Sequence, residues 1–126
     1  MTELFYKRLP LAPAAGGANA CRPYFVVWEV TLRCDQSCRF CGTRAGHARP
    51  DELDTDEALD VVRQLAELGT KEVALHGGEA YLRKDWLTLV KSIRAHGMEC
   101  TMVTGGRGFT RAMCAEAKEA GITSVS

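Results

Sequence analysis

Short, dense runs of apolar residues alternate along this chain with longer segments in which apolar residues recur every three or four positions. The run at residues 24–30 is rich in β-branched and aromatic residues and lacks strict alternation, which is typical of a parallel strand covered on both faces. Further runs lie at residues 71–75, 98–104 and 122–126. The pattern therefore predicts four strands, of which the last only begins before the chain stops.

Three segments between these runs predict amphipathic helices. Each begins after a residue whose side chain can cap the first turn, and each ends at a glycine, which readily adopts the left-handed conformation of a helix stop. The first also carries Glu57 three residues after its cap, the spacing of a capping box. The caps and stops, in chain order, are Asp54 and Gly69, Asp85 and Gly97, and Thr110 and Gly121.

The strict alternation of strand and helix predicts an α/β fold of parallel (β/α) repeats with right-handed crossovers. In such folds the loops at the carboxyl ends of the strands gather at one edge of the sheet, where sites form. We therefore expect the chemistry of this chain in the loops that follow its strands.

Composition limits the chain to one modest core. Residues 1–23 mix Pro, Ala and Gly without a sustained period and predict a flexible leader, which leaves residues 24–126 as a single core domain. The 16 basic and 16 acidic residues balance, so nothing indicates binding to nucleic acid or to an anionic membrane. No apolar run approaches the length that crosses a bilayer, and no signal peptide is evident, so we expect a cytoplasmic protein.

Three of the six cysteines stand close together in the loop after the first predicted strand. Cys34, Cys38 and Cys41 are separated by three and then two residues, and clustered thiolates favour zinc, copper(I) or an iron–sulfur cluster over a disulfide scaffold. A structural zinc requires four protein ligands. A four-iron cube held by three thiolates instead keeps one iron open for another ligand.

The cysteine spacing, with Phe40 directly before the last thiol, resembles the signature of the radical S-adenosylmethionine (radical SAM) family. A second motif agrees with it, because residues 76–79 read His-Gly-Gly-Glu directly after the next predicted strand, where that family carries Gly-Gly-Glu. The resemblance implies the N-terminal part of a partial (β/α)6 TIM-like barrel. Because only four of its strands are present, we expect a truncated chain or a fragment of a longer protein.

The resemblance also implies a function. Cys34, Cys38 and Cys41 would bind a [4Fe-4S] cluster, and S-adenosylmethionine would chelate the open iron through its amino and carboxylate groups. An electron from a reductant such as flavodoxin or ferredoxin would then cleave the cofactor to a 5′-deoxyadenosyl radical, which abstracts hydrogen from the substrate. The substrate is unknown, and a peptide or a cofactor precursor is preferred from the resemblance alone.

Six further residues are candidates for contact with S-adenosylmethionine. The glycines would allow close backbone approach, the glutamate would accept a hydrogen bond from the ligand's ammonium, the phenylalanine would pack on the adenine, and two hydroxyls would reach its ribose or methionine part. A core aromatic and ordinary strand-end hydroxyls are alternative interpretations of the last three. The candidates are Phe40, Gly77, Gly78, Glu79, Thr104 and Ser126.

Two other interpretations stay open at the level of sequence. The three thiols can hold structural zinc with His47 or Cys21 as the fourth ligand, although the Gly-Gly-Glu motif would then have no role. A truncated product that keeps the motifs without turnover is the other. Ala80 stands where the family usually has proline after the glutamate, which predicts a less rigid loop.

Overall fold

The computed structural model describes residues 22–126, so Cys21 and nearly all of the predicted leader lie outside the described residues. Strands and helices alternate as the apolar pattern predicts, with one short 3-10 helix added. The elements are β1 (Phe25–Thr31), α1 (Thr55–Glu67), β2 (Glu72–Gly77), η1 (Ala80–Leu82), α2 (Trp86–Ala95), β3 (Glu99–Met102), α3 (Arg111–Ala120) and β4 (Ser124–Val125).

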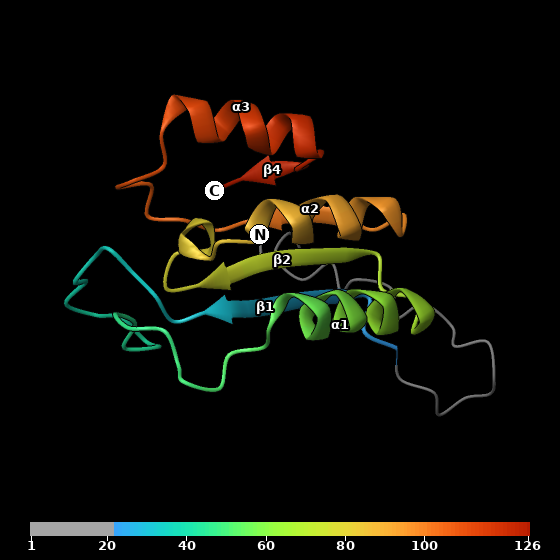
Figure 1. Cartoon of the computed structure of the whole chain (residues 1–126), viewed down its shortest axis with the longest axis horizontal. Helices are drawn as coiled ribbons and strands as arrows, with labels where there is room; N and C mark the ends of the chain where they lie inside the picture. The colour runs from blue at the N-terminus through green and yellow to red at the C-terminus, as the bar shows by residue number, and fades with distance from the viewer. Residues whose placement is uncertain (1–21) are drawn as a thin grey trace, which may run out of the picture.

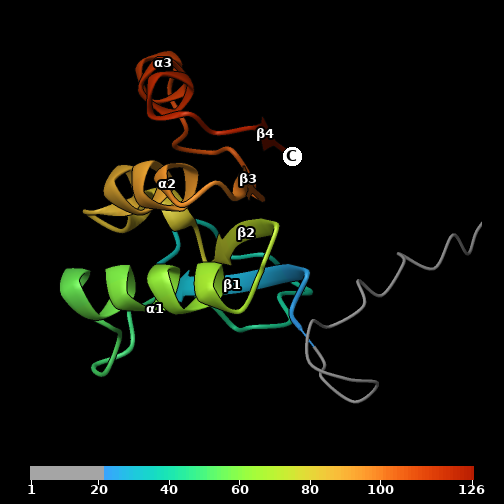
Figure 2. The ribbon, with the colours of Figure 1, turned by 90° about the vertical axis from the view of Figure 1, so that its right-hand side faces the viewer.

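All four strands of the described chain form one parallel sheet in the order β1-β2-β3-β4. Val27 pairs with Ala74, Ala74 with Thr101, and Thr101 with Ser124, so the register runs straight across the sheet. Figure 2 shows the three α-helices along the same face of this sheet. The predicted parallel α/β fold is confirmed.

The hydrophobic core lies between this face of the sheet and the helices. Strand residues Val73, Leu75 and Met102 pack there against Val62 and Leu89 of the helices, and each is at most 1% exposed. Cys100 of β3 belongs to the same cluster, and its burial raises the pKa of the thiol to about 12, which keeps it protonated. Cys100 is therefore a packing residue rather than a ligand.

The helix caps test the sequence prediction residue by residue. Asp54 and Glu57 form the predicted capping box of α1, and Thr110 accepts a hydrogen bond from the Met113 backbone at the start of α3. The prediction that the Asp85 side chain caps α2 is wrong, because that carboxylate is bound by other side chains instead.

No helix within residues 22–126 has the length and apolar character needed to cross a membrane.

Strand β2 extends two residues beyond its predicted end and runs through Gly77. The register shifts between Glu29 and Thr31, at the carboxyl end of β1, so the last pair joins Thr31 to Gly77. Backbone pairing then continues past both strands, because Gly78 N donates to Thr31 O at 2.8 Å and Glu79 N donates to Arg33 O at 2.8 Å. These bonds tie the two sequence motifs together.

Candidate functional site

The cysteine loop, residues 32–53, leaves β1 at the edge of the sheet where β2 also ends, as Figure 1 shows at its left side. The loop folds back on itself through two backbone hydrogen bonds. Cys34 N donates to Gly46 O at 3.1 Å, and Gly46 N donates to Leu32 O at 2.9 Å. The first thiol is therefore carried on a stretch that is held from both sides, at the strand's end.

Hydrogen-bond donors already face two of the three thiols. Gln36 N donates to Cys34 Sγ at 3.4 Å, and Ala45 N donates to Cys41 Sγ at 3.3 Å. The Thr43 hydroxyl, 3.5 Å from Cys41 Sγ, and the Ala45 N–H group lower the pKa of Cys41. Donors of this kind stabilise thiolate sulfur, the form that binds metal, and they tune iron–sulfur clusters.

The separations of the ligand atoms bear on the zinc interpretation. A tetrahedral zinc with Zn–S bonds of about 2.3 Å holds its sulfurs about 3.8 Å apart. Within residues 22–126, the only group of three or more metal-ligand atoms with all separations within 4.8 Å comes from Cys34, Asp35 and Glu79. The three thiols, with or without His47, therefore do not stand at the separations of a zinc site.

The two glycines of the second motif face the cysteine loop rather than open space. A Cβ built on Gly77 would lie 2.2 Å from Thr31 O, and one on Gly78 would lie 2.3 Å from Arg33 O. Only glycine allows the backbones to approach this closely. The expected close approach is present, but the surface approached is the chain that leads into Cys34.

Glu79 is the buried centre of the site, with 2% of its surface exposed. Its Oε1 accepts hydrogen bonds from Gln36 Nε2 and Gly105 N, both at 2.7 Å, and its Oε2 accepts one from the Thr104 hydroxyl. The carboxylate thus joins the cysteine loop to the loop after β3. An N–H donor from Gln36 already occupies one of the positions that a ligand ammonium would use.

Asp35 makes a second connection between the same loops. Tyr81 donates its hydroxyl proton to Asp35 Oδ2 at 2.8 Å and accepts from Gly108 N at 2.9 Å, while Arg107 Nη1 donates to Asp35 O at 3.0 Å. Burial, and then the bond to Asp35, raises the pKa of Tyr81 to about 12, so the phenol is a donor at neutral pH. The other carboxylate oxygen, Asp35 Oδ1, is buried without a hydrogen-bond partner.

The remaining candidates lie at the margins. Phe40 is 92% exposed, and Arg39 lies over its ring with the guanidinium carbon 5.9 Å from the centroid. Ser126 follows β4, where its carbonyl accepts from Thr104 N at 2.9 Å. His76 pairs across the sheet with Glu29, outside the group around Glu79. The structure therefore brings Glu79, Thr104 and Cys34 together, while Phe40 stands in solvent.

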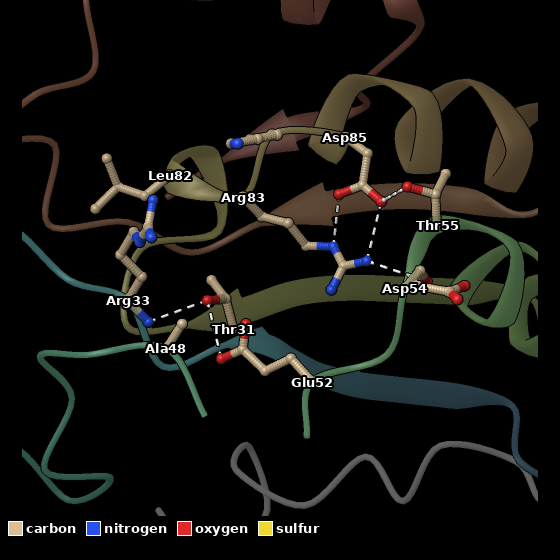
Figure 3. Close-up of a pocket in the computed structure, with 10 residues that line it drawn as sticks. Thr31, Arg33, Ala48, Glu52, Asp54, Thr55, Leu82, Arg83 and Asp85 are labelled. Carbon is tan, nitrogen blue, oxygen red and sulfur yellow. Dashed lines mark hydrogen bonds and ion pairs between the residues drawn. The ribbon is translucent and has the colours of Figure 1, made fainter. Parts of the chain in front are cut away.

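An open cavity of about 300 Å³ lies beside the cysteine loop, between the end of β1, the start of α1 and residues 82–85 (Figure 3). Most of its charged side chains already make hydrogen bonds within the protein. Arg83 donates to Asp85 at 2.6 Å and to Val30 O at 3.1 Å, and the Thr55 hydroxyl donates to Asp85 at 2.7 Å. Glu79 and the thiols do not line the cavity, so we interpret its lining residues as groups that hold the cysteine loop in place rather than as the site itself.

Glu52 of this cavity anchors the base of the cysteine loop. Its Oε1 accepts from Leu32 N at 2.8 Å, from Arg49 N at 3.0 Å and from the Thr31 hydroxyl at 3.1 Å. Burial alone would raise the pKa of Glu52, but the backbone N–H groups of Leu32 and Arg49 outweigh it, so the pKa is lowered. The ionised carboxylate therefore stabilises the folded loop.

We expect Glu52→Gln to lower the free energy of unfolding by about 1–2 kcal/mol at neutral pH, because charge-assisted bonds become neutral ones. A lowered pKa stabilises the fold above the unfolded-state value and loses this effect as pH falls through the folded-state value. The difference between wild type and variant should therefore shrink at about pH 3. Urea unfolding at both pH values measures it, with Asp51→Asn in the same loop as control. An equal difference at both pH values would contradict this role.

The family model described as "Radical SAM superfamily" matches residues 28–126. The crystal structure of BtrN in complex with AdoMet and 2-DOIA superposes with a TM-score of 0.70 at 21% identity, covering 82% of this chain and 44% of that one. Streptococcus suis SuiB bound to S-adenosylmethionine gives 0.66 at 20% identity, covering 75% and 22%. At these identities the two structures show the fold, and the chain spans less than half of either.

Sequence reasoning missed four residues that build the site: Asp35, Gln36, Glu52 and Tyr81. Asp35 and Gln36 stand inside the cysteine motif, and polar side chains between closely spaced thiols are a signal in the sequence for both of them. Glu52 and Tyr81 carry no such signal, because Glu52 binds backbone 20 residues earlier at the start of its loop, and Tyr81 binds Asp35, 46 residues earlier.

Proposed function

The chain belongs to the radical SAM superfamily, and from this premise we propose that it binds a [4Fe-4S] cluster and S-adenosylmethionine and acts as an enzyme that starts a radical reaction. In this proposal Cys34, Cys38 and Cys41 bind the cluster, and S-adenosylmethionine chelates the iron that lacks a protein ligand. Together the two groups supply reductive cleavage of the cofactor to a 5′-deoxyadenosyl radical, which abstracts hydrogen from the substrate.

The chain's own residues place and shield the cofactor. Glu79 accepts an N–H bond from the ligand's amino group, in the way that it accepts one from Gln36 Nε2 at 2.7 Å. Gly77 and Gly78 bring this carboxylate next to the cysteine loop, since any larger residue would collide with the backbone of residues 31–33. Phe40, 92% exposed, is available to cover the adenine, and Thr104 sets the orientation of Glu79 rather than meeting the ribose.

One observation supports this proposal most strongly. The thiol of Cys34 lies within 4.8 Å of a carboxylate oxygen of the buried Glu79, so the two family motifs form one site although these two residues are 45 positions apart in the chain. A thiolate cluster with an open iron beside a buried acceptor fits a ligand that carries both a chelating amine and further N–H donors. The BtrN and SuiB structures are complexes with this same cofactor, which agrees with the proposal.

Substrate and partner are further parts of the proposal. We infer a cytoplasmic setting with a flavodoxin or ferredoxin as electron donor. Arg33, Arg39 and Arg44 are exposed on the cysteine loop and suit an acidic donor. A peptide or a cofactor precursor stays the preferred substrate class.

The proposal predicts that the anaerobically reconstituted chain releases 5′-deoxyadenosine and methionine when S-adenosylmethionine and a strong reductant are added. Chromatography of the quenched mixture measures both products. Omission of the reductant and reconstitution with zinc in place of iron are the controls. A chain that holds a full cluster yet releases neither product above these controls would contradict the proposed activity.

A further inference from the structure

The carboxylate of Glu79 has little hydrogen-bonding capacity left. A carboxylate offers about four acceptor positions, two on each oxygen. Gln36 Nε2 and Gly105 N use both positions on Oε1, and the Thr104 hydroxyl uses one on Oε2. A primary ammonium has three N–H donors, and an amine that coordinates metal still has two. Glu79 alone therefore leaves at least one donor of the ligand's amino group without a protein acceptor.

The neighbouring carboxylate, that of Asp35, has an acceptor without a donor. Asp35 Oδ1 is buried and has no hydrogen-bond partner among the described residues. Leaving such an oxygen unpaired costs stability, so this acceptor is free to take a donor from a water molecule or from a bound ligand. A carboxylate oxygen of Asp35, one of Glu79 and the Cys34 thiol all lie within 4.8 Å of one another.

The separation of the two carboxylates suits one shared nitrogen. Charge-assisted N–H···O bonds are about 2.8 Å long, and two N–H bonds of one tetrahedral nitrogen diverge by about 109°, so one nitrogen bonds to two oxygens about 4.6 Å apart. The two carboxylate oxygens lie within 4.8 Å of each other, which is compatible with this separation. Asp35 is also held in place, because Tyr81 binds its Oδ2 at 2.8 Å and Arg107 binds its carbonyl at 3.0 Å. The side chain is thus positioned before any ligand arrives.

We propose that Asp35 Oδ1 is a second acceptor for the amino group of S-adenosylmethionine, sharing that group with Glu79 beside Cys34. The inference rests on the proposed function, because it assigns a contact within the same cofactor site. Asp35 thereby makes the site selective for ligands that carry an amino group next to the chelating carboxylate.

The test compares two ligands in one variant. The reconstituted chain is titrated with S-adenosylmethionine and with the analogue in which hydrogen replaces the α-amino group. Asp35→Asn keeps an oxygen for Tyr81 but loses the charge, so we expect S-adenosylmethionine to bind roughly tenfold more weakly while the analogue binds as before. Asp51→Asn, an exposed aspartate of the same loop, should change neither dissociation constant. Iron content and circular dichroism verify that each variant is loaded and folded.

The possible outcomes distinguish a failure of this inference from a failure of the proposed function. If Asp35→Asn weakens both ligands equally, or neither, Asp35 is a structural residue and the inference fails while the proposed function stands. If the wild-type chain with a full cluster binds neither ligand, both fail together. If the Asp35→Asn variant does not assemble the cluster, the Tyr81→Phe variant tests the inference instead. This substitution removes the hydrogen bond that holds Asp35 Oδ2 in place but keeps the Asp35 carboxylate. The preference for the amino ligand should then fall several-fold, and an unchanged preference contradicts the inference.

Discussion

Replacing any one of Cys34, Cys38 and Cys41 by alanine should abolish both cluster assembly and release of 5′-deoxyadenosine. The cube needs a thiolate on each of three irons. Among the described residues, the one close group of ligand atoms at this edge adds the carboxylates of Asp35 and Glu79 to Cys34 but no spare thiol. We expect about four iron atoms per chain in the reconstituted wild type and far fewer in each variant. Iron and sulfide analysis, with product chromatography, measures the loss.

Cys114→Ala is the matched control for these variants. Cys114 is an exposed cysteine on α3, away from the cysteine loop, so its loss should leave iron content and product release unchanged. This pairing separates the effect of a particular ligand from the general effect of removing a thiol during reconstitution. A variant at position 34, 38 or 41 that keeps both full iron content and turnover would show that its sulfur is not a cluster ligand.

The second large effect is expected at Gly78. The Cβ introduced by Gly78→Ala would lie 2.3 Å from Arg33 O and 2.7 Å from Leu32 O, and both contacts are with backbone, which cannot rotate away. The chain must shift, which breaks the bonds from Gly78 N to Thr31 O and from Glu79 N to Arg33 O. We expect a loss of about 2–4 kcal/mol of stability. Binding of S-adenosylmethionine should be lost with it, because Glu79 and Cys34 move apart.

Gly42→Ala provides the control for this substitution within the cysteine loop. A Cβ built on Gly42 meets nothing within 4 Å, so the same chemical change should cost little. Urea unfolding and equilibrium dialysis with the labelled cofactor measure the two properties. Equal stability and equal affinity in the two variants would mean that close approach of the motifs is not what Gly78 provides.

Local patterns in the sequence were sufficient for the framework of the fold. The strands followed from β-branched and aromatic runs, and the caps of α1 and α3 followed from Asp54, Glu57 and Thr110, because capping bonds span only a few residues. Asp85 shows where this reasoning ends. Its carboxylate had a competing partner in Arg83, two residues earlier, and another in Thr55, thirty residues away.

The site was predictable in its motifs but not in its connections. The thiols and Glu79 were recognised from their spacing and order. Gln36 and Asp35 were not, since their partners Glu79 and Tyr81 lie 43 and 46 residues further along the chain. The glycines were expected to approach a ligand, and the structure shows instead that they approach the backbone before Cys34. Contacts of this kind depend on how β1 and β2 pair, which the local pattern does not specify.

The central claim is that three thiolates leave one iron of a cluster open for S-adenosylmethionine. The electron paramagnetic resonance spectrum of the reduced, reconstituted chain, recorded before and after addition of this cofactor, tests it most directly. We expect a cluster signal that changes in shape when S-adenosylmethionine is added, because the cofactor binds an iron of the cluster itself. A signal that stays the same at saturating cofactor, or a chain that takes up one zinc and no cluster, would contradict it.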